Sequence, residues 1–441
     1  MAEHVMFLSI PGLRPADLHA GRLPNLQRLV ADGESRELVP TFPCVTSPVQ
    51  STMWTGVGPD RHGVIANGFY HRDRREVELW IAFNQVHQAP QLWDAIARND
   101  GLTSAVWHAQ NIKDAAADFI CTPAPIHDAD GTTKPWCYSK PDGLYERLVA
   151  DLGHFPLQHY WGPLSNIESS KWTVEAALWL HRHYAPNFHW VYLQHLDYAG
   201  QKVGPEGPEA LAALQELDAL IGHFVDAMRK LPGGDEVDWI VAGEYALTDV
   251  RGAVFPNRML REAGLLRVNV ESDGEHLDLA GSDAFAMVDH QVAHVYVTPE
   301  KVEAVAELFT AAPGIAVVAA GPERGVLGMD HERAGEVVLA GEHDRWFAYY
   351  WWLEDAAAPG FARTVDIHRK PGYDPVELFF DPSTRSIPID ASLVKGSHGA
   401  PADRPEQRTM MLSSLPGVLT ETSDPMRDTE VHGVLSRALG L

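Results

Sequence analysis

The chain has 441 residues, of which 45% are hydrophobic and 22% charged, and its net charge is −25. These proportions are ordinary for a globular protein, and the length allows one large core with an insertion or two domains. The strong negative charge argues against a nucleic-acid polymer or an anionic membrane as partner. A small anionic substrate stays compatible with it, because a bound cation can reverse the charge locally.

The chain lacks the usual sequence signals for membranes and export. No apolar run approaches the roughly 20 residues that span a bilayer, and the start "MAEHVMFLSIPG" has neither a basic region nor a small-residue cleavage site. The three cysteines Cys44, Cys121 and Cys137 have no metal-binding spacing, which predicts a reducing compartment. We therefore expect a cytoplasmic protein; its oligomeric state is left open.

Buried strands and amphipathic helices alternate along the first part of the chain. In order, the pattern predicts a strand at 4–10, helices at 23–33 and 86–99, strands at 102–109 and 189–197, a helix at 208–230 and a strand at 237–244. Such alternation is typical of an α/β fold with a mostly parallel central sheet and helices on both faces.

The stretch "FPCVTSPVQSTMWTG" at 42–56 predicts a helix with Ser47 as N-cap, Pro48 in the first position and Gly56 at the end. Helix N-termini carry unpaired N–H groups and attract phosphate. Thr46 would hold its hydroxyl beside that anion site. The alternative is that Thr46 only helps to cap the helix.

The pattern changes after about residue 285, where short strands and one helix predict a compact α+β unit. We interpret 285–365 as an inserted cap subdomain, and 1–284 with 366–441 as the core. The chain returns through "VDIHRKPGYDP" and "KGSHGAP" to a last helix within "DTEVHGVLSRALG".

In open α/β sheets, ligands bind beyond the carboxyl ends of the strands. The polar residues predicted to gather there share carboxylate, imidazole or hydroxyl chemistry: Thr46, Asp197, Glu244, His290, Asp366, His368 and His398. Mixed carboxylates and imidazoles suit Zn²⁺ or another divalent transition metal. One strand-end histidine alone is more often structural, whereas several favour a metal site.

The segments "IPGLRP", "LPNLQRLVADG", "PTFPCVTSPVQSTMWTGVGPDRHGVIANGFY", "DYAGQKVGP" and "GSHG" occur in a recognisable order. The chain resembles the nucleotide pyrophosphatase/phosphodiesterase branch of the alkaline phosphatase superfamily, with 285–365 placed like that family's cap. The resemblance implies an alkaline-phosphatase-like fold, Thr46 as nucleophile and Asn67 as a phosphate-binding residue. Cys44 is then a packing residue.

Members of that family hold two metals with the threonine and six Asp or His side chains, and the resemblance is incomplete at these positions. Asp197 and His398 match, and Glu244 stands for an aspartate. Pro11, Gln201 and Tyr245 stand where the family has an aspartate and two histidines. We therefore expect one ion rather than two, with His368, preferred over His290, and Asp366 as replacement ligands.

Three functions are compatible with these residues. The first is a metal-dependent hydrolase of a phosphate mono- or diester of a small metabolite or nucleotide, in which Glu244 is a metal ligand or a base. The second is a non-catalytic ligand-binding relative, favoured by the lost ligands. The third is a non-hydrolytic enzyme acting on a phosphorylated metabolite.

Overall fold

A nine-stranded sheet organises the larger lobe of the computed structural model, which describes residues 3–127, 133–366 and 369–441. Its five central strands are parallel, in the order β11-β1-β10-β5-β6, and antiparallel neighbours join at both sides. In sheet order the strands are β23 (Met426–Arg427), β2 (Glu34–Val39), β22 (Thr409–Ser413), β11 (Val237–Gly243), β1 (His4–Ile10), β10 (Phe188–Tyr192), β5 (Ser104–Trp107), β6 (Phe119–Pro123) and β9 (Cys137–Lys140).

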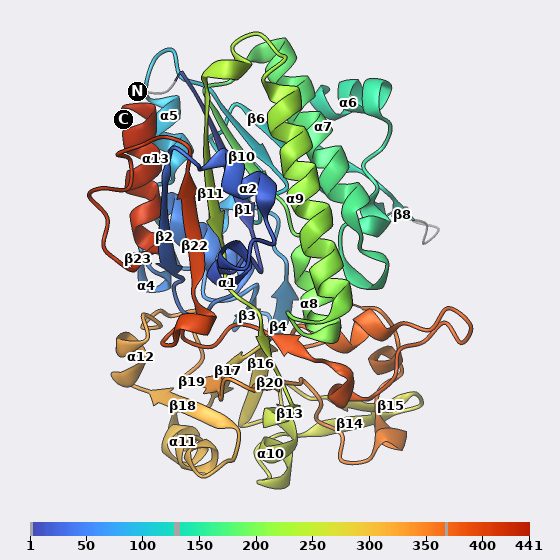
Figure 1. Ribbon diagram of the computed structural model, residues 1–441. Helices are drawn as coiled ribbons and strands as arrows, with labels where there is room; N and C mark the ends of the chain where they lie inside the picture. Colours follow the sequence, from blue (N-terminus) through green and yellow to red (C-terminus); the bar gives the residue numbers. More distant parts are fainter. Residues whose placement is uncertain (1–2, 128–132, 367–368) are drawn as a thin grey trace.

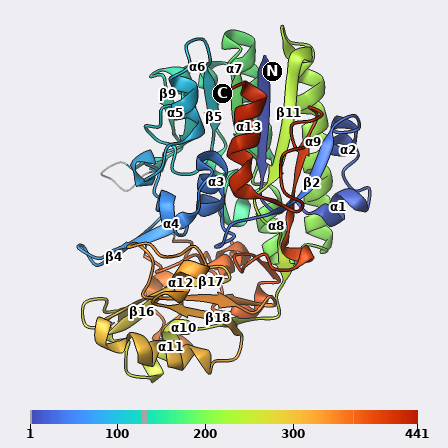
Figure 2. The same ribbon diagram turned by 90° about the vertical axis from the view of Figure 1, so that its left-hand side faces the viewer.

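Helices cover both faces of this sheet (Figures 1 and 2). All seven residues of β1 are buried, and alternate side chains join different cores, with Phe7 in one and Leu8 in the other. One face is covered by α2 (Pro24–Leu29), α6 (Leu144–Leu152), α7 (Ile167–Tyr184), α8 (Leu196–Val203) and α9 (Pro208–Met228), and the other by α3 (Thr46–Thr55), α5 (Leu92–Ala97) and α13 (Val431–Leu439). Burial on both faces is what an uninterrupted apolar strand predicts, and the α/β class is confirmed.

A second, smaller lobe lies against one end of the sheet (Figure 1). It is built on a four-stranded antiparallel sheet in the order β16-β17-β19-β18. These strands are β16 (Ala284–Asp289), β17 (Val292–Val297), β19 (Val337–Gly341) and β18 (Ile315–Ala320), with helices α10 (Pro256–Glu262), α11 (Val302–Thr310) and α12 (Glu323–Val326). The lobe has a core of its own, which includes the fully buried Trp346 and Trp352.

The boundaries of this lobe differ in detail from the predicted insertion. The chain leaves the nine-stranded sheet after β11, and among the described residues it next contributes a strand to that sheet at β22. Helix α10 precedes residue 285, yet Asn257 on α10 exchanges two hydrogen bonds with the backbone of Ala286. The division at 285 and 365 stays a prediction.

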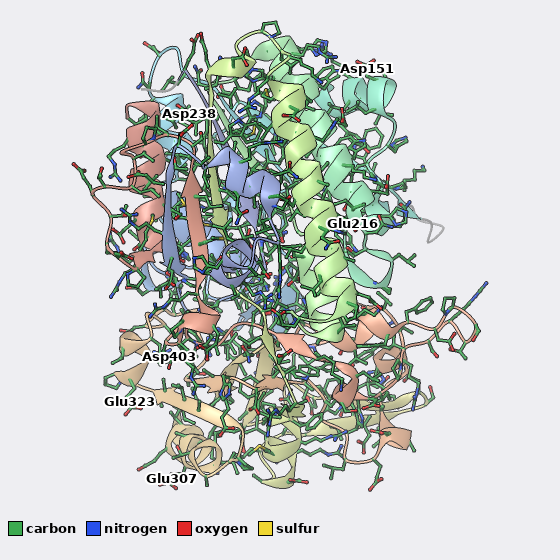
Figure 3. The ribbon with its side chains drawn as sticks, viewed as in Figure 1. Asp151, Glu216, Asp238, Glu307, Glu323 and Asp403 are labelled. Carbon is green, nitrogen blue, oxygen red and sulfur yellow. The ribbon has the colours of Figure 1, made fainter. Side chains whose placement is uncertain are left out.

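Acidic side chains are distributed over both lobes rather than gathered in one run. Figure 3 labels Glu216 on α9, Glu307 on α11 and Glu323 on α12, on separate parts of the molecule. In the part of the chain that the structure describes, no helix combines the length and apolarity that crossing a membrane requires.

Candidate active site

Helix α3 begins at Thr46, two residues earlier than the sequence predicts, and Val45 is its extended N-cap. The prediction of Ser47 as N-cap was wrong because a distant residue satisfies this helix end: the Ser47 N–H donates to Oδ1 of Asn67 over 2.9 Å. Pro48 therefore lies in the first turn, where its missing N–H costs nothing. Gly56 ends the helix in the left-handed conformation, as predicted.

Asn67 links the start of α3 to the second lobe. Its backbone N–H donates to Asp289 Oδ2 over 2.9 Å, and its side-chain amide donates to Oδ1 over 3.2 Å. The same Asp289 Oδ1 lies 2.7 Å from Nδ1 of His290. His290 has a φ of 59°, an uncommon conformation for a residue other than glycine, and no described residue hydrogen-bonds its buried Nε2.

Glu244 follows directly after β11 and is completely buried. Its Oε1 accepts hydrogen bonds from Ser9 Oγ at 2.6 Å and from Gln50 Nε2 at 2.7 Å, whereas Oε2 has no hydrogen-bond partner among the described residues. Burial raises the pKa of Glu244 to about 8, although the neighbouring Ser9, Gln50 and Thr46 side chains lower it. The carboxyl is therefore mainly protonated at neutral pH.

Asp197 lies in the first turn of α8, not at the end of a strand as predicted, because β10 already ends at Tyr192. One helical turn later, Gln201 Nε2 donates to Asp197 Oδ2 over 2.8 Å. The other carboxylate oxygen, Oδ1, is buried, has no hydrogen-bond partner within the described part of the chain, and lies 3.7 Å from Nε2 of His398. Burial raises the pKa of Asp197.

His398 reaches this point because glycine lets its strand approach α8 closely. A Cβ on Gly396 would lie 2.2 Å from the carbonyl oxygen of Gly200, so no other residue fits there without a backbone shift. The Nδ1 of His398 lies 2.7 Å from the carbonyl oxygen of Cys44. This contact assigns the proton to Nδ1 and leaves Nε2 with its lone pair. Burial lowers the pKa of His398 well below its usual value.

Tyr245 fills the space between the threonine and this histidine. Its ring stacks on His398 with centroids 3.7 Å apart and 5° between the planes, and its hydroxyl lies 3.1 Å from Thr46 Oγ1. His398 in turn contacts His290, whose ring stacks on Tyr373. Burial raises the pKa of Tyr245 well above its usual value, so its hydroxyl keeps its proton.

These contacts test which metals the site could hold. Pro11 has no side-chain donor atom. Tyr245, which stands where the family has a histidine ligand, packs its ring flat on His398. The donor set does not fit a pair of metals. Asp197 Oδ1 and His398 Nε2 are buried, unpartnered and 3.7 Å apart, which fits part of a single-ion site.

A single-ion site of this kind needs a third protein ligand. The rings of His290 and His398 have centroids 3.9 Å apart, but among the described residues these two histidines and Asp197 do not form a set of three ligand atoms within 4.8 Å of one another. His368, the preferred third ligand, lies outside the described residues. Its role stays a prediction.

Asp366 lies in a different group of charges. Its carboxylate accepts from Arg369 Nε over 2.5 Å, and its backbone N–H donates to Glu377 Oε1 over 2.9 Å. The buried Lys370 Nζ also contacts Glu377, at 2.5 Å, and Asp374, at 2.8 Å. The predicted metal role of Asp366 has no support from these contacts and stays a prediction.

Sequence reasoning missed three residues that shape the site: Asp289, Gln50 and Tyr373. Asp289 holds both Asn67 and His290, Gln50 holds Glu244, and the Tyr373 hydroxyl donates to Gln201 Oε1 over 2.9 Å. Asp289 directly precedes the candidate His290, and Tyr373 lies in the segment "VDIHRKPGYDP" of the sequence analysis. Gln50 carries no local signal, because its partner is 194 residues away.

Comparison with known proteins places this arrangement in a family. The sequence model of type I phosphodiesterase / nucleotide pyrophosphatase matches residues 5–374. Ectonucleotide pyrophosphatase/phosphodiesterase family member 1 of Mus musculus is 25% identical over 271 residues, covering 60% of this chain and 26% of the mouse protein. Human bis(5'-adenosyl)-triphosphatase is 24% identical over 247 residues, covering 55% and 47%. The matched regions thus span about a quarter to a half of these relatives.

Solved structures show the same fold. An inactive variant of murine ectonucleotide pyrophosphatase/phosphodiesterase 5, in complex with AMP, superposes with a TM-score of 0.62 at 15% identity, covering 100% of this chain and 95% of that one. Phosphonoacetate hydrolase from Sinorhizobium meliloti 1021, in complex with phosphonoformate, gives 0.64 at 15% identity, covering 99% and 96%. Fold and resemblance are thereby confirmed: the chain belongs to the type I phosphodiesterase / nucleotide pyrophosphatase family, a branch of the alkaline phosphatase superfamily.

Proposed function

We propose that the chain hydrolyses a phosphate mono- or diester of a small metabolite or nucleotide, with Thr46 as the nucleophile. The observation that carries this proposal is the position of the Thr46 hydroxyl at the start of buried α3, 3.1 Å from the Tyr245 hydroxyl and close enough to Glu244 to lower the pKa of its carboxyl. Nucleophile, proton acceptor and anion-attracting helix end would then act at one point.

In this mechanism the Thr46 oxygen attacks phosphorus, the bond to the leaving oxygen breaks, and water hydrolyses the phosphothreonine. A threonine hydroxyl needs a base, and the unpartnered Oε2 of Glu244 is the candidate acceptor for its proton. With a pKa of about 8, only about a tenth of this carboxyl is ionised at pH 7, so its capacity to act as a general base increases as the pH rises toward 8. The Tyr245 phenol stays protonated and can donate a hydrogen bond to the reacting oxygen.

One divalent transition metal, with Zn²⁺ the best match to a carboxylate and an imidazole, would be held by Asp197 and His398. Bound there, it would offset the negative charge of the phosphoryl oxygens. His290 or His368 would supply a further donor. Support for this metal comes from the unpartnered Asp197 Oδ1 and His398 Nε2, buried in a site that hydrogen-bonds most of its other polar atoms.

A second candidate function is binding without catalysis. Tyr245 packs flat on His398, and Gln201 hydrogen-bonds Asp197. Both residues stand where the family has histidine ligands, and both now contact the remaining candidate ligands instead. Such a site could recognise a phosphorylated ligand through α3 and Asn67 while lacking the charge needed for turnover. A non-hydrolytic reaction on a phosphorylated metabolite is the third alternative.

Turnover assays with p-nitrophenyl phosphate and bis(p-nitrophenyl) phosphate, after dialysis against Zn²⁺, separate these functions. Hydrolysis that Thr46→Ala abolishes, with a trapped covalent phosphate visible in the intact mass of the wild type, is the expected result. If neither ester is cleaved but calorimetry detects binding of AMP, the binding function replaces the hydrolase. Consumption of a phosphorylated metabolite without phosphate release would identify the third alternative.

A further inference from the structure

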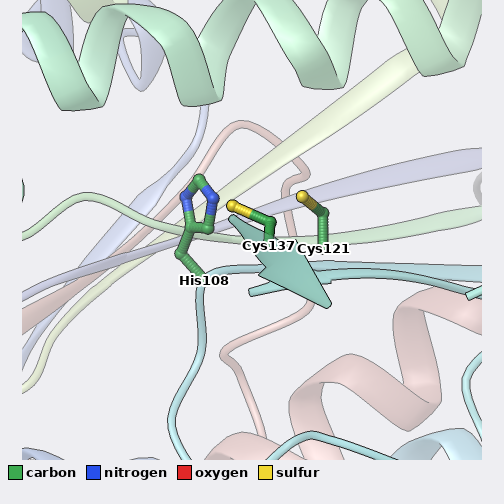
Figure 4. Close-up of side chains that lie close together, drawn as sticks. All are labelled: His108, Cys121 and Cys137. Atoms are coloured by element: carbon green, nitrogen blue, oxygen red, sulfur yellow. The ribbon is translucent and has the colours of Figure 1, made fainter. Parts of the chain in front are cut away.

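A second group of metal-ligating side chains lies at the far edge of the nine-stranded sheet. His108 follows β5, Cys121 lies in β6 and Cys137 begins β9. One ligand atom from each lies within 4.8 Å of the other two, and all three residues are buried (Figure 4). None of them belongs to the candidate active site.

The hydrogen bonds of His108 leave one ring nitrogen ready to coordinate. The Thr173 hydroxyl donates to the carbonyl oxygen of Ser169 over 2.9 Å, so it must accept at its 2.8 Å contact with His108 Nδ1. The proton of the neutral ring is therefore on Nδ1. The remaining nitrogen, Nε2, keeps a lone pair, is buried and accepts no hydrogen bond from any residue that the structure describes. Figure 4 shows a ring nitrogen turned toward the Cys137 sulfur.

The backbone holds this histidine in a strained position. His108 has a φ of 58°, which side chains with a Cβ rarely adopt. Its N–H donates to the Cys121 carbonyl oxygen over 2.8 Å, which fixes the histidine against the strand that carries the first thiol. Strain of this kind is found at sites where the surrounding structure fixes a side chain for a purpose.

The two thiols lie diagonally across an antiparallel strand pair, because Cys137 is opposite Pro123 and Cys121 is opposite Ser139. Both therefore point to the same face of the sheet. Diagonal partners have Cα atoms roughly 7–8 Å apart, whereas disulfides usually join Cα atoms about 4.4–6.8 Å apart. This register favours two separate sulfur ligands over a disulfide.

We propose that His108, Cys121 and Cys137 bind one Zn²⁺ ion that staples β5, β6 and β9 together. Each thiol releases its proton to solvent on binding, and the two thiolates with one neutral imidazole cancel the charge of a divalent ion. Charge balance matters here because the surroundings are the aromatic rings of Phe155, Tyr160 and Trp172. A monovalent Cu⁺ would leave a net negative charge in the same place.

The geometry needs only small adjustments. Ligand atoms around a tetrahedral zinc lie roughly 3.5–3.8 Å apart, so atoms already within 4.8 Å of one another must move by about 1 Å or less. The Tyr145 hydroxyl lies next to the Cys137 thiol at the border of the cluster. The Thr173 hydroxyl already orients the histidine through its contact with Nδ1.

Cobalt substitution tests the site without any mutation. The full-length protein, refolded with Co²⁺ in place of Zn²⁺, should show intense thiolate-to-cobalt charge-transfer absorption, which oxygen and nitrogen ligands at the candidate active site cannot produce. The matched control is Cys44→Ser, which removes the one cysteine outside the cluster and should leave the absorption unchanged. Cys121→Ser should abolish it.

Elemental analysis completes the test. Zinc-replete wild type and the Asp197→Asn variant should both keep the cluster's ion, and Cys137→Ser should lose it. Chelation should lower the Tm of wild type and Cys44→Ser alike. Absence of the charge-transfer band from refolded wild type would overturn the proposal, as would an intact mass showing a disulfide between Cys121 and Cys137. If protein purified from cells contains no zinc at the cluster and shows an absorption band typical of Cu⁺–thiolate clusters, the choice of zinc would be overturned.

Discussion

The candidate active site and the thiol cluster differ in what has happened to their ligands. At the first site, three positions that bind metals in relatives hold Pro11, Gln201 and Tyr245. At the second, two cysteines and a histidine with no sequence spacing in common meet at a sheet edge. The first site has the proposed nucleophile and few donors, and the second has donors and no nucleophilic alcohol among them.

This difference teaches that a ligand set must be judged by the support behind each donor. In the active site, Gln201 and Tyr245 have been absorbed into hydrogen bonds and stacking, so the remaining unpartnered atoms are few. In the thiol cluster, Thr173 orients the histidine and strand pairing aligns the cysteines. The family's sequence motif is better preserved in the candidate active site. The side chains that could bind a metal are better positioned in the thiol cluster.

The largest effect is expected from Thr46→Ala. Loss of the nucleophile should lower kcat for ester hydrolysis by about three orders of magnitude or more. Circular dichroism and zinc bound at the thiol cluster should not change, because the two sites share no residue. Steady-state kinetics and elemental analysis of the same sample check both halves. Retained turnover would reduce Thr46 to a structural residue.

Next in size is the pH dependence caused by Glu244. Its folded-state pKa of about 8 lies above the ordinary 4.5, so the folded state binds more protons than the unfolded state between these values. The contribution of Glu244 to the free energy of unfolding should therefore be largest below pH 4.5 and should fall as the pH rises to 8. The total decrease is at most roughly 4–5 kcal/mol. Glu244→Gln should remove this slope, measured by urea unfolding across pH.

The thiol cluster should show the opposite sign, which sharpens the comparison. Zinc keeps the two thiols deprotonated in the folded state, so its stabilising effect should grow as pH rises toward the ordinary thiol pKa of about 8.5. The Glu244→Gln variant lacks the opposing effect of Glu244. With zinc bound, its free energy of unfolding should increase with pH over the neutral range more than that of wild type. If the zinc-dependent part of the stability is independent of pH, thiolate ligation is contradicted.

A smaller effect is expected from Tyr245→Phe. The ring and its stacking on His398 remain, and only the hydroxyl 3.1 Å from Thr46 is lost. We expect kcat to fall about tenfold, corresponding to one hydrogen bond in the transition state, with KM little changed. The comparison variant Tyr245→His, which restores the family's residue type, should instead raise metal content. An unchanged kcat in Tyr245→Phe would remove the phenol from the mechanism.

The smallest effect should follow Cys44→Ser. The Cys44 thiol is buried and donates a long hydrogen bond to the Pro40 carbonyl oxygen, 3.8 Å away. The contact that matters for the site comes from its backbone carbonyl, which serine retains. We expect kcat to change less than about twofold and stability to fall by about 1 kcal/mol. A large loss of activity would show that the cysteine itself takes part.

Sequence patterns predicted the sheet class, the strand at 4–10 and the helix at 208–230 well, since apolar periodicity is read directly from neighbouring residues. Boundaries that depend on distant partners were less accessible. The start of α3 is set by Asn67, and Asp197 lies in a helix because β10 ends early. The thiol cluster was missed altogether, because strand pairing rather than sequence spacing brings Cys121 and Cys137 together.

The column of rings formed by Tyr245, His398, His290 and Tyr373 has a mechanical consequence. Tyr245 follows β11 of the large lobe, whereas His290 lies in the turn between β16 and β17 of the small one. Any hinge motion that parts the lobes must therefore unstack at least one pair of rings, at about 0.5–1.5 kcal/mol a pair. The aromatic column therefore opposes separation of the two lobes at the candidate active site.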